Sequence, residues 1–293
     1  MSNFLVSGLV NLETNVKTDG FPIDYMPITY PLFGVRTAVS GVGYNISKAL
    51  MTLGNGVDFY TLIYPDEPGN CIKETLHSLD ISTHIEQGKL KATPTSANLY
   101  DKKGKRRIFC DLKNIQACRL TALPTENDWE RFCAAVICNI NFAKPLLKEA
   151  KRHNVPIVTD LHVFSNINDE YNNPWLKSAN TVFLSDEGLP CTPKTFLRQL
   201  SAAYPNIEII VLGQGSKGAL LYKCKEHTFI KQKAVKPVKV VNTVGAGDAL
   251  LSAFTHFYYG LHISAEDALH KAQTFASIKI GFDGGAEGFK NID

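Results

Sequence analysis

A glycine-rich stretch near the C-terminus, NTVGAGD at residues 242–248, carries residue types that could stabilise an anion and react with it. A helix beginning at about Ala246 leaves the backbone N–H groups of Gly245, Ala246 and Gly247 unpaired at its positive end. Asp248, in the first turn, could accept a proton from a hydroxyl that attacks the bound anion. Positioned N–H groups and one carboxylate base are most of what phosphoryl transfer needs. Taken alone, the pattern fits an ordinary capped helix equally well.

A second glycine set lies in IIVLGQGSKGALLYK, where Gly213, Gly215 and Gly218 match G-x-G-x-x-G. After a strand, this spacing suggests a dinucleotide site and hence a nicotinamide-dependent oxidoreductase. That hypothesis requires a helix directly after Gly218. The residues that follow, GALLYK, predict a strand instead, so a tight turn between two strands is favoured.

A third set occurs in VSGVGYNISKAL, in which Ser40, Gly41 and Gly43 precede a predicted helix. Asn45 falls in the first turn of that helix, where its amide could both donate and accept hydrogen bonds. Close backbone approach together with such an amide would suit a polyhydroxy ligand. A helix entry that binds nothing explains the same residues equally well.

The elements that must position these residues alternate between strands and helices. Apolar runs predict strands, and 3.6-residue spacing predicts helices. The predicted strands are 4–10, 57–64, 134–140, 155–161, 181–185, 207–213, 218–223 and 227–232, and the predicted helices are 43–54, 69–80, 143–153, 192–204 and two after residue 245. Such alternation predicts a mostly parallel central sheet with helices on both faces, an α/β fold.

Two polar, β-like segments interrupt the alternation, at about residues 14–38 and 94–110. The second predicts a hairpin that turns near Gly104. The two segments could form a small separate sheet. Ligands of open α/β sheets bind outside the carboxyl ends of the strands, so this sheet would be suited to act as a lid over that edge.

Composition narrows the classes of function. The chain has 293 residues, a net charge of +3 and seven cysteines without a CxxC pair. The basic run at residues 102–107 is a weak signal for nucleic acid, and a solvated hairpin explains it better, so no nucleic-acid partner is expected. The cysteine spacing disfavours both a disulfide framework and a zinc site. No apolar run approaches the length of a membrane span and no leader is recognisable, so we expect a cytoplasmic protein without a membrane partner.

Together, the three glycine sets resemble the ribokinase-like, or PfkB, carbohydrate kinases. That family has a glycine-rich segment with an asparagine near residue 40 and a D-T-x-G-A-G-D signature near the C-terminus. The similarity also covers GLVNLE, YPDEPGN and VLGQGSKGALL, and so spans nearly the whole chain. It implies a single ribokinase-like three-layer α/β domain over residues 1–293 with a small β lid. It further implies an ATP-dependent kinase acting on a hydroxymethyl group of a sugar or nucleoside.

The resemblance also assigns roles by position. Asp248 is the expected base, and Gly245, Ala246 and Gly247 form the expected anion hole. The expected substrate contacts are Asn11, Glu13, Gly41, Asn45 and Asn139, and the expected nucleotide contacts are Gly213, Gly215, Gly218 and Asn242. ATP is the expected phosphoryl donor, and Mg²⁺ would bridge its phosphates mostly through water, with Glu187 supporting it indirectly.

The chain departs from the family pattern at several positions. Asn242 replaces the first aspartate of the signature, Glu13 stands where aspartate is usual, and the N-x-x-E element is degraded around Glu187. These departures keep open a catalytically inactive relative that senses a sugar or nucleoside, although a pure binder has no need of Asp248. SGVGYNIS and CNIN resemble the pseudouridine-kinase branch, and a simple pentose or hexose remains equally open. The outer surface of the lid could pair with a second copy, which predicts a homodimer.

Overall fold

The computed structural model of the chain describes residues 1–79, 81–102 and 105–292. The strands are β1 (Asn3–Ser7), β2 (Asn11–Lys17), β3 (Val35–Ser40), β4 (Gly56–Leu62), β5 (Ser82–Glu86), β6 (Thr95–Tyr100), β7 (Arg106–Asp111), β8 (Phe132–Ile137), β9 (Ile157–Val163), β10 (Thr181–Ser185), β11 (Ile209–Gly213), β12 (Ala219–Lys223) and β13 (Thr228–Gln232). The α-helices are α1 (Val42–Thr52), α2 (Glu67–His77), α3 (Glu126–Trp129), α4 (Lys144–Arg152), α5 (Asn173–Leu176), α6 (Pro193–Ala203), α7 (Ala246–Thr255) and α8 (Ala265–Lys279). Single turns of 3₁₀-helix cover Ile115–Ala117, Asn141–Ala143 and Gly215–Lys217, and a π-helical turn, His256–Gly260, follows α7.

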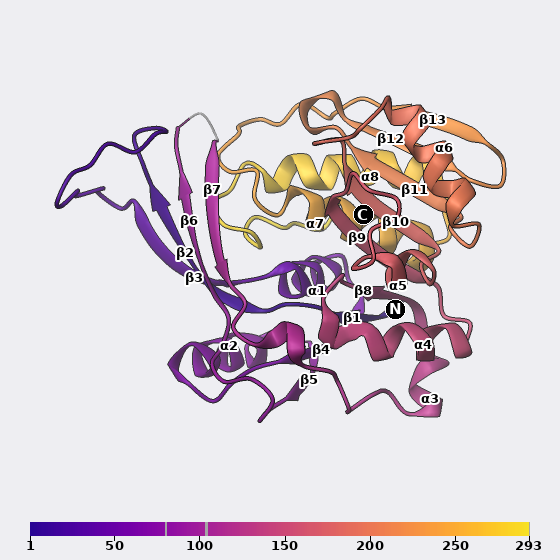
Figure 1. Cartoon of the computed structure of the whole chain (residues 1–293), viewed down its shortest axis with the longest axis horizontal. Helices are drawn as coiled ribbons and strands as arrows, with labels where there is room; N and C mark the ends of the chain where they lie inside the picture. Colours follow the sequence, from indigo (N-terminus) through magenta and orange to yellow (C-terminus); the bar gives the residue numbers. More distant parts are fainter. Residues whose placement is uncertain (80, 103–104, 293) are drawn as a thin grey trace.

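Within the described residues the larger sheet has nine strands in the order β13-β12-β11-β10-β9-β8-β1-β4-β5 (Figure 1). The strands from β5 to β11 are parallel. β12 is antiparallel to its neighbours β11 and β13, so β13 again runs in the direction of the parallel strands. The predicted α/β, ribokinase-like three-layer fold is therefore confirmed. β12 begins directly after Gly218, where a dinucleotide fingerprint requires a helix, so the oxidoreductase hypothesis is wrong.

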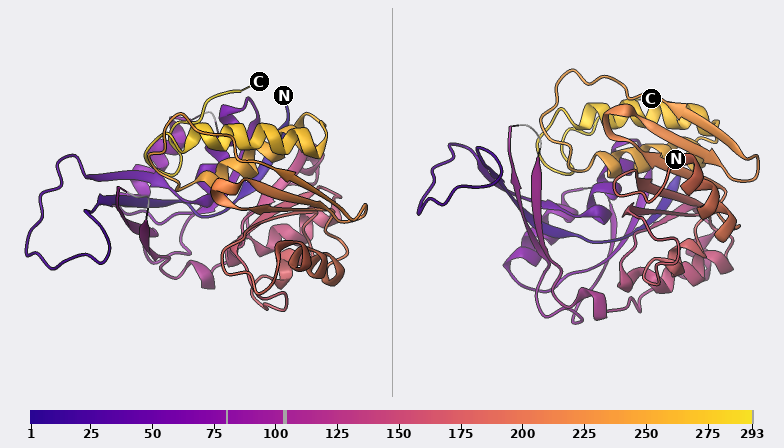
Figure 2. Two further views of the ribbon diagram at one scale, coloured as in Figure 1. Left: turned by 90° about the horizontal axis from the view of Figure 1, so that it is seen from above. Right: turned by 45° about the horizontal axis from the view of Figure 1, so that its top comes forward.

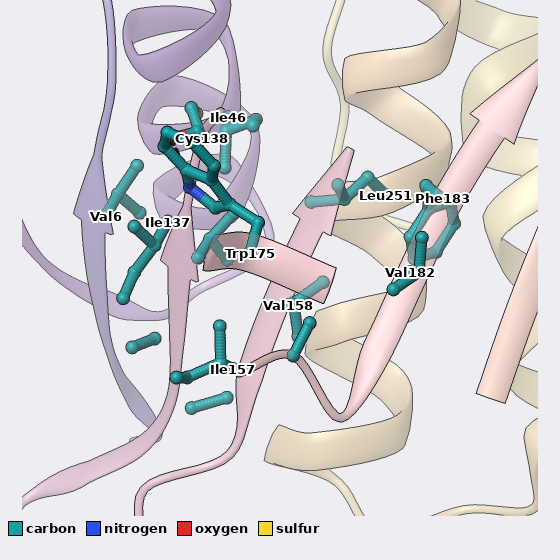
Figure 3. Close-up of a cluster of buried hydrophobic side chains, with 14 of the residues drawn as sticks. Val6, Ile46, Ile137, Cys138, Ile157, Val158, Trp175, Val182, Phe183 and Leu251 are labelled. Atoms are coloured by element: carbon teal, nitrogen blue, oxygen red, sulfur yellow. Dashed lines mark hydrogen bonds between the residues drawn. The ribbon is translucent and has the colours of Figure 1, made fainter. Parts of the chain in front are cut away.

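Helices cover both faces of this sheet. α7 packs between α1 and α8 on one face, while α4, α5 and α6 lie on the other (Figure 2). Figure 3 shows Ile46 of α1 and Leu251 of α7 within the cluster of buried side chains that the strands contribute. Each such side chain stabilises the fold by roughly 1.5–3 kcal/mol. This packing fixes α1 and α7 on the sheet, and with them the two helix starts that carry the candidate site.

Helix starts follow local capping rules. The Ser264 hydroxyl accepts a hydrogen bond from Asp267 N at 3.1 Å at the start of α8. Asp66 caps α2 in the same way, accepting from Gly69 N at 3.0 Å. Each cap satisfies an otherwise unpaired N–H group, so these helix starts can be predicted from the sequence.

The smaller sheet has four strands in the order β3-β2-β6-β7, and β2 and β6 pair in parallel. Together with the 18–34 loop it extends beyond the main body on one side (Figures 1 and 2). Its strands come from the two predicted segments, but β2 already begins at Asn11, because the polar alternation starts there. The predicted turn at Gly104 lies outside the described residues. Assignment of residues 1–293 to a single domain stays a prediction.

None of the helices in the described part of the chain combines the length and the hydropathy that a membrane span needs.

Candidate active site

The candidate site lies at the carboxyl edge of the parallel strands. There the end of β10 pairs with the end of β11, with Ser185 opposite Gly213, and Asp186 N donates to the Gly213 carbonyl at 2.9 Å. Asp160, the middle residue of β9, pairs with Phe183 of β10. Ligands of open α/β sheets bind at this edge.

α7 begins at Ala246, as the sequence predicts. Gly245 precedes it with φ 78°, in the left-handed region that favours glycine, and a Cβ at this position would lie 2.0 Å from the Gly285 carbonyl oxygen. The Ala246 N–H donates to the Thr243 carbonyl at 3.2 Å. Across the described residues, the N–H groups of Gly245 and Gly247 have no protein acceptor. The expected set of three free donors is thus reduced to two.

Asp248 lies in the first turn of α7 and is only 8% exposed. The Asn45 Nδ2 atom, from the first turn of α1, donates to its Oδ2 atom at 2.7 Å. Burial raises the pKa of Asp248 to about 6, and the Asn45 hydrogen bond partly opposes that shift. A carboxylate with this pKa is ionised at neutral pH yet basic enough to take a proton.

A second ionised pair borders the start of α7. The Asp160 carboxylate lies 3.4 Å from Nδ1 of His162 and also accepts from His162 N at 2.8 Å. The Asp160 charge raises the pKa of His162 to about 9, while burial opposes the rise. Burial alone would raise the pKa of Asp160, but His162 reverses that and lowers it. A Cβ on Gly247 would be 3.7 Å from the Asp160 Oδ2 atom, so this pair faces the anion hole. Sequence reasoning missed it, although Asp160 stands at the end of a predicted strand.

The structure gives Asn242 a structural role in the loop before α7. Its Nδ2 atom donates to Asp283 Oδ1 at 2.9 Å, and its Oδ1 atom accepts from Val244 N at 2.9 Å. An aspartate here would set two carboxylates against each other. Asparagine in place of the aspartate of the family signature is therefore explained by Asp283, to which it donates a hydrogen bond. Contact between Asn242 and a nucleotide stays a prediction.

A row of buried polar side chains lines the face of the smaller sheet that is turned toward the main body, because alternate residues of a strand share one face. We call this the polar row; its members are Asn11, Glu13, Asn15, Ser96 and Asn98.

Hydrogen bonds link the polar row. Asn11 Nδ2 donates to Ser96 Oγ at 2.8 Å, Asn15 Nδ2 to Glu13 Oε1 at 3.1 Å, and Asn98 Nδ2 to Asn15 Oδ1 at 3.3 Å. Sequence reasoning found Asn11 and Glu13 but missed the other three members. The period-2 spacing of Asn11, Glu13 and Asn15 was the available signal.

Two buried amide oxygens at the site, Asn45 Oδ1 and Asn98 Oδ1, have no hydrogen-bond donor among the described residues. An unpaired buried acceptor costs roughly 1–3 kcal/mol. Hydroxyl groups of a bound ligand would satisfy both.

Two of the four glycines at the other expected contacts are required by packing. Gly41 has φ 109°, and a Cβ on it would lie 2.6 Å from the Leu9 carbonyl oxygen. Gly218, in the turn between β11 and β12, has φ 100°, and a Cβ would lie 2.0 Å from the Gln232 carbonyl oxygen. Gly213 and Gly215 have no such contact within 3.4 Å. Binding roles for these glycines stay predictions.

Two further expected residues follow strands of the larger sheet, Asn139 after β8 and Glu187 after β10. The Asn139 amide donates to Asn172 Oδ1 at 3.1 Å, and Glu187 is exposed after β10. In the described part of the chain, no group of three or more His, Cys, Asp or Glu side chains could hold a metal ion. This donor set fits an Mg²⁺ ion carried by nucleotide phosphates and water, which needs only one or two protein carboxylates.

One residue of the basic run also reaches the site. Arg106 Nη1 donates to Thr243 Oγ1 at 3.2 Å, which joins β7 of the smaller sheet to the loop before α7. Arg106 is exposed on β7, as the solvated-hairpin interpretation expects, and it makes this contact in addition. Nothing in the sequence signals this contact, because the two residues are far apart in the chain.

Comparisons with known proteins identify the family of the chain. The model of the family described as pfkB family carbohydrate kinase matches residues 1–291. A 5-dehydro-2-deoxygluconokinase of Mesomycoplasma hyopneumoniae (strain 232) is 23% identical over 304 aligned positions, covering 95% of this chain and 87% of that protein. A microbiome-derived acarbose kinase has a similar structure, with a TM-score of 0.85 at 20% identity over 99% of this chain and 96% of that one. Arabidopsis thaliana ribokinase, solved with ribose and ATP, gives a TM-score of 0.79 at 19% identity over 99% and 96% of the two chains. The pseudouridine-kinase branch is not confirmed by these matches.

Proposed function

Because the chain belongs to the pfkB family of carbohydrate kinases, we propose that it transfers the γ-phosphoryl group of ATP to a hydroxymethyl group of a sugar or nucleoside. The observation that carries the proposal is the placement of Asp248. This buried carboxylate has a pKa raised to about 6 and stands in the same helix turn as the free N–H group of Gly247. A base and an anion site side by side are what this transfer requires.

ATP would lie along the carboxyl edge of the sheet, between the turn at 213–218 and the start of α7. Its γ-phosphate would accept hydrogen bonds from the N–H groups of Gly245 and Gly247, at the positive end of the helix dipole. A helix N-terminus attracts such an anion and also stabilises charge that develops during the transfer.

In the reaction, Asp248 accepts the proton of the acceptor hydroxyl as that oxygen attacks the γ-phosphorus atom. The bond from this phosphorus to the β–γ bridging oxygen breaks, and ADP leaves with the electron pair. Asn45 holds the Asp248 carboxylate in place through its 2.7 Å hydrogen bond. A bound Mg²⁺ ion would neutralise charge on the phosphates, and Glu187 would support it through water.

The polar row supports a polyhydroxy acceptor. Its amide and carboxylate groups can donate to or accept from several hydroxyls, and Asn98 Oδ1 is already an unsatisfied acceptor. Glu13 would hold an acceptor hydroxyl in place of the usual aspartate. We propose roles in acceptor binding for Asn11, Glu13, Gly41 and Asn45, and for Asn139 at the margin of the site.

The inactive sensor is not supported, because the relatives are named as kinases and Asp248 is retained in a geometry suited to a base. A reducing compartment such as the cytoplasm would suit the protein, since its seven cysteines are all free.

The smaller sheet supports a homodimer. The 18–34 loop exposes several large apolar side chains, among them Tyr25, Tyr30, Leu32 and Phe33. The outer face of the sheet has a hollow of about 530 Å³ lined by residues that include Leu12, Thr14 and Phe109. Exposed apolar surface of this kind marks an interaction site. Sedimentation equilibrium on the unmodified chain and on the double variant Tyr30→Ser, Phe33→Ser tests this: a dimer mass that becomes monomeric supports the proposal, and a monomer mass for the unmodified chain removes it.

A coupled assay of ADP release across acceptors tests the function. The panel contains 5-dehydro-2-deoxygluconate, ribose, other pentoses and hexoses, nucleosides and pseudouridine, each with ATP and Mg²⁺. We expect acceptor-dependent ADP release with at least one compound, and release that is about 10²- to 10⁴-fold slower with Asp248→Asn. Release that does not depend on any acceptor would contradict the proposal.

A further inference from the structure

A lysine is completely buried behind the loop that precedes α7. Lys279 is the last residue of α8, and its side chain is 0% exposed. A lysine at a helix C-terminus ordinarily extends into water and interacts with the helix dipole. Here the side chain turns inward, and its Nζ atom donates to the Val244 carbonyl oxygen. Since burial of an ammonium group is costly, its location calls for an explanation.

The contacted carbonyl belongs to the peptide unit that also carries the Gly245 N–H group. This peptide bond is trans, as the only cis bond in the described residues is Phe21–Pro22. In a planar trans peptide the C=O and N–H bonds point in opposite directions. A donor that fixes the Val244 oxygen on one side therefore directs the Gly245 N–H group to the other side. That N–H group is one of the two free donors of the anion hole.

Further hydrogen bonds hold the residues that lead up to this peptide unit. Val244 N donates to Asn242 Oδ1 at 2.9 Å, while the backbone N–H groups of Val241 and Asn242 donate to the Ile280 carbonyl at 2.8 and 3.2 Å. The C-terminal end of α8 thus anchors the segment, and Lys279 adds the contact closest to Gly245.

The charges around Lys279 are mostly negative. Asp248 of α7, Asp283 after α8 and Glu13 of β2 attract its ammonium group, and Arg106 of β7 repels it. Burial lowers the pKa of Lys279 to about 8, and the three carboxylates limit the fall. The side chain is therefore protonated at neutral pH and places a positive charge beside the base and the anion hole.

We infer that Lys279 is a positioning residue for phosphoryl transfer, whose ammonium group holds the Val244 carbonyl so that the Gly245 N–H points at the transferred phosphoryl group. The inference rests on the proposed function, because it gives Lys279 a role in that reaction. With this role for Lys279, the site has a buried cation at the end of α8 in addition to its backbone N–H donors.

The test compares Lys279→Met, which keeps the length but removes the charge, with Lys271→Met. Lys271 lies on the same helix, with its Nζ atom 4.8 Å from the centre of the Phe257 ring and remote from the loop. We expect Lys279→Met to lower kcat by roughly 10²-fold, as for a misplaced oxyanion donor, with KM values within about threefold. Lys271→Met should leave both unchanged. In Lys279→Ala, added propylammonium should raise kcat at least about tenfold, because it can supply the missing ammonium group. Added 1-propanol should leave kcat unchanged.

A second readout does not depend on turnover. The chain contains two Val-Gly pairs, Val42–Gly43 and Val244–Gly245, so paired ¹³C-valine and ¹⁵N-glycine labelling isolates these two amides. The chemical shift of the Gly245 amide should change in Lys279→Met and should not change in Lys271→Met. The Gly43 amide signal is the internal reference. In the unmodified chain it should titrate at a pH of about 8.

The outcomes separate the two claims. If the unmodified chain transfers no phosphoryl group, the proposed function fails, and the Gly245 amide still decides whether Lys279 sets its position. If turnover is present but Lys279→Met matches Lys271→Met in kcat and in the Gly245 signal, the inference is overturned. Should Lys279→Met fail to fold, the Gly245 amide of the unmodified chain decides: a signal that does not change as Lys279 loses its proton, between about pH 7 and 9, overturns the inference.

Discussion

Replacement of Asp248 by asparagine should slow turnover without loss of binding or fold. Asparagine has nearly the same size and can still accept a hydrogen bond from Asn45, but it cannot take the proton of a hydroxyl. General bases contribute about 10²- to 10⁴-fold, so kcat should fall by that factor, equivalent to roughly 3–5 kcal/mol. The Kd for ATP should change by less than about threefold, since the anion hole is built from backbone.

The same substitution has a calculable effect on stability. The folded-state pKa of Asp248 is raised from 3.8 to about 6, so the folded protein holds this proton more tightly than the unfolded chain does. Stability from this group is therefore gained as pH falls through about 6 and is absent above it. Two pKa units correspond to roughly 3 kcal/mol, the approximate cost of keeping the carboxylate charged in the fold.

Asp248→Asn should accordingly melt at or above the unmodified protein at pH 8, and the difference should narrow as the pH is lowered toward 5. The matched control is Asp267→Asn, because Asp267 occupies the same third position in α8 as Asp248 does in α7. The assays are kcat, calorimetric ATP affinity and melting temperature at both pH values. If Asp248→Asn melted lower at pH 8 and its rate loss merely followed unfolding, or if kcat were unchanged, Asp248 would be a helix cap and our reasoning would be refuted.

Three further outcomes are expected. Gly247→Val should lower kcat by about 10²-fold while melting within a few degrees of the unmodified protein, because a Cβ there meets only Asp160 Oδ2, at 3.7 Å; unchanged turnover would place the anion hole elsewhere. Asn98→Ala should raise the acceptor KM by about tenfold and leave the ATP KM unaltered, since it removes one hydrogen bond to a hydroxyl, and equal changes in both would argue against the polar row. In the unmodified enzyme, kcat should fall about tenfold per pH unit below about 6, as Asp248 becomes protonated; a flat profile down to pH 5 would exclude it as the base.

The start of α7 could be predicted from the sequence because it is set locally. The local sequence alone shows a glycine before Ala246, where the backbone is left-handed, and an aspartate in the first turn. The same is true of the Asn45 position in α1. The direct contact between Asn45 and Asp248 could be expected only from the family resemblance, because 203 positions separate the two residues in the chain.

The polar row shows what the sequence could not provide. Asn15 and Asn98 meet because β2 and β6 pair in parallel across more than eighty residues, and no local pattern encodes that register. The position of Lys279 could not be predicted for a different reason. Lysine is so common at the ends of helices that its presence there does not indicate a functional role. The departure at Asn242 was visible, but its explanation, Asp283, became apparent only once the two loops were placed together.

Transfer of label from γ-³²P-ATP distinguishes a kinase from a protein that only hydrolyses or binds ATP. With the acceptor identified by the screen, label should appear in the acceptor in equal amount to ADP, and NMR should locate the phosphate on the oxygen of its hydroxymethyl group. Asp248→Asn should slow that transfer by about 10²- to 10⁴-fold, whereas Asp267→Asn should preserve it. Label recovered only as inorganic phosphate, or transfer in Asp248→Asn at the rate of the unmodified chain, would show that Asp248 is not the base of a kinase.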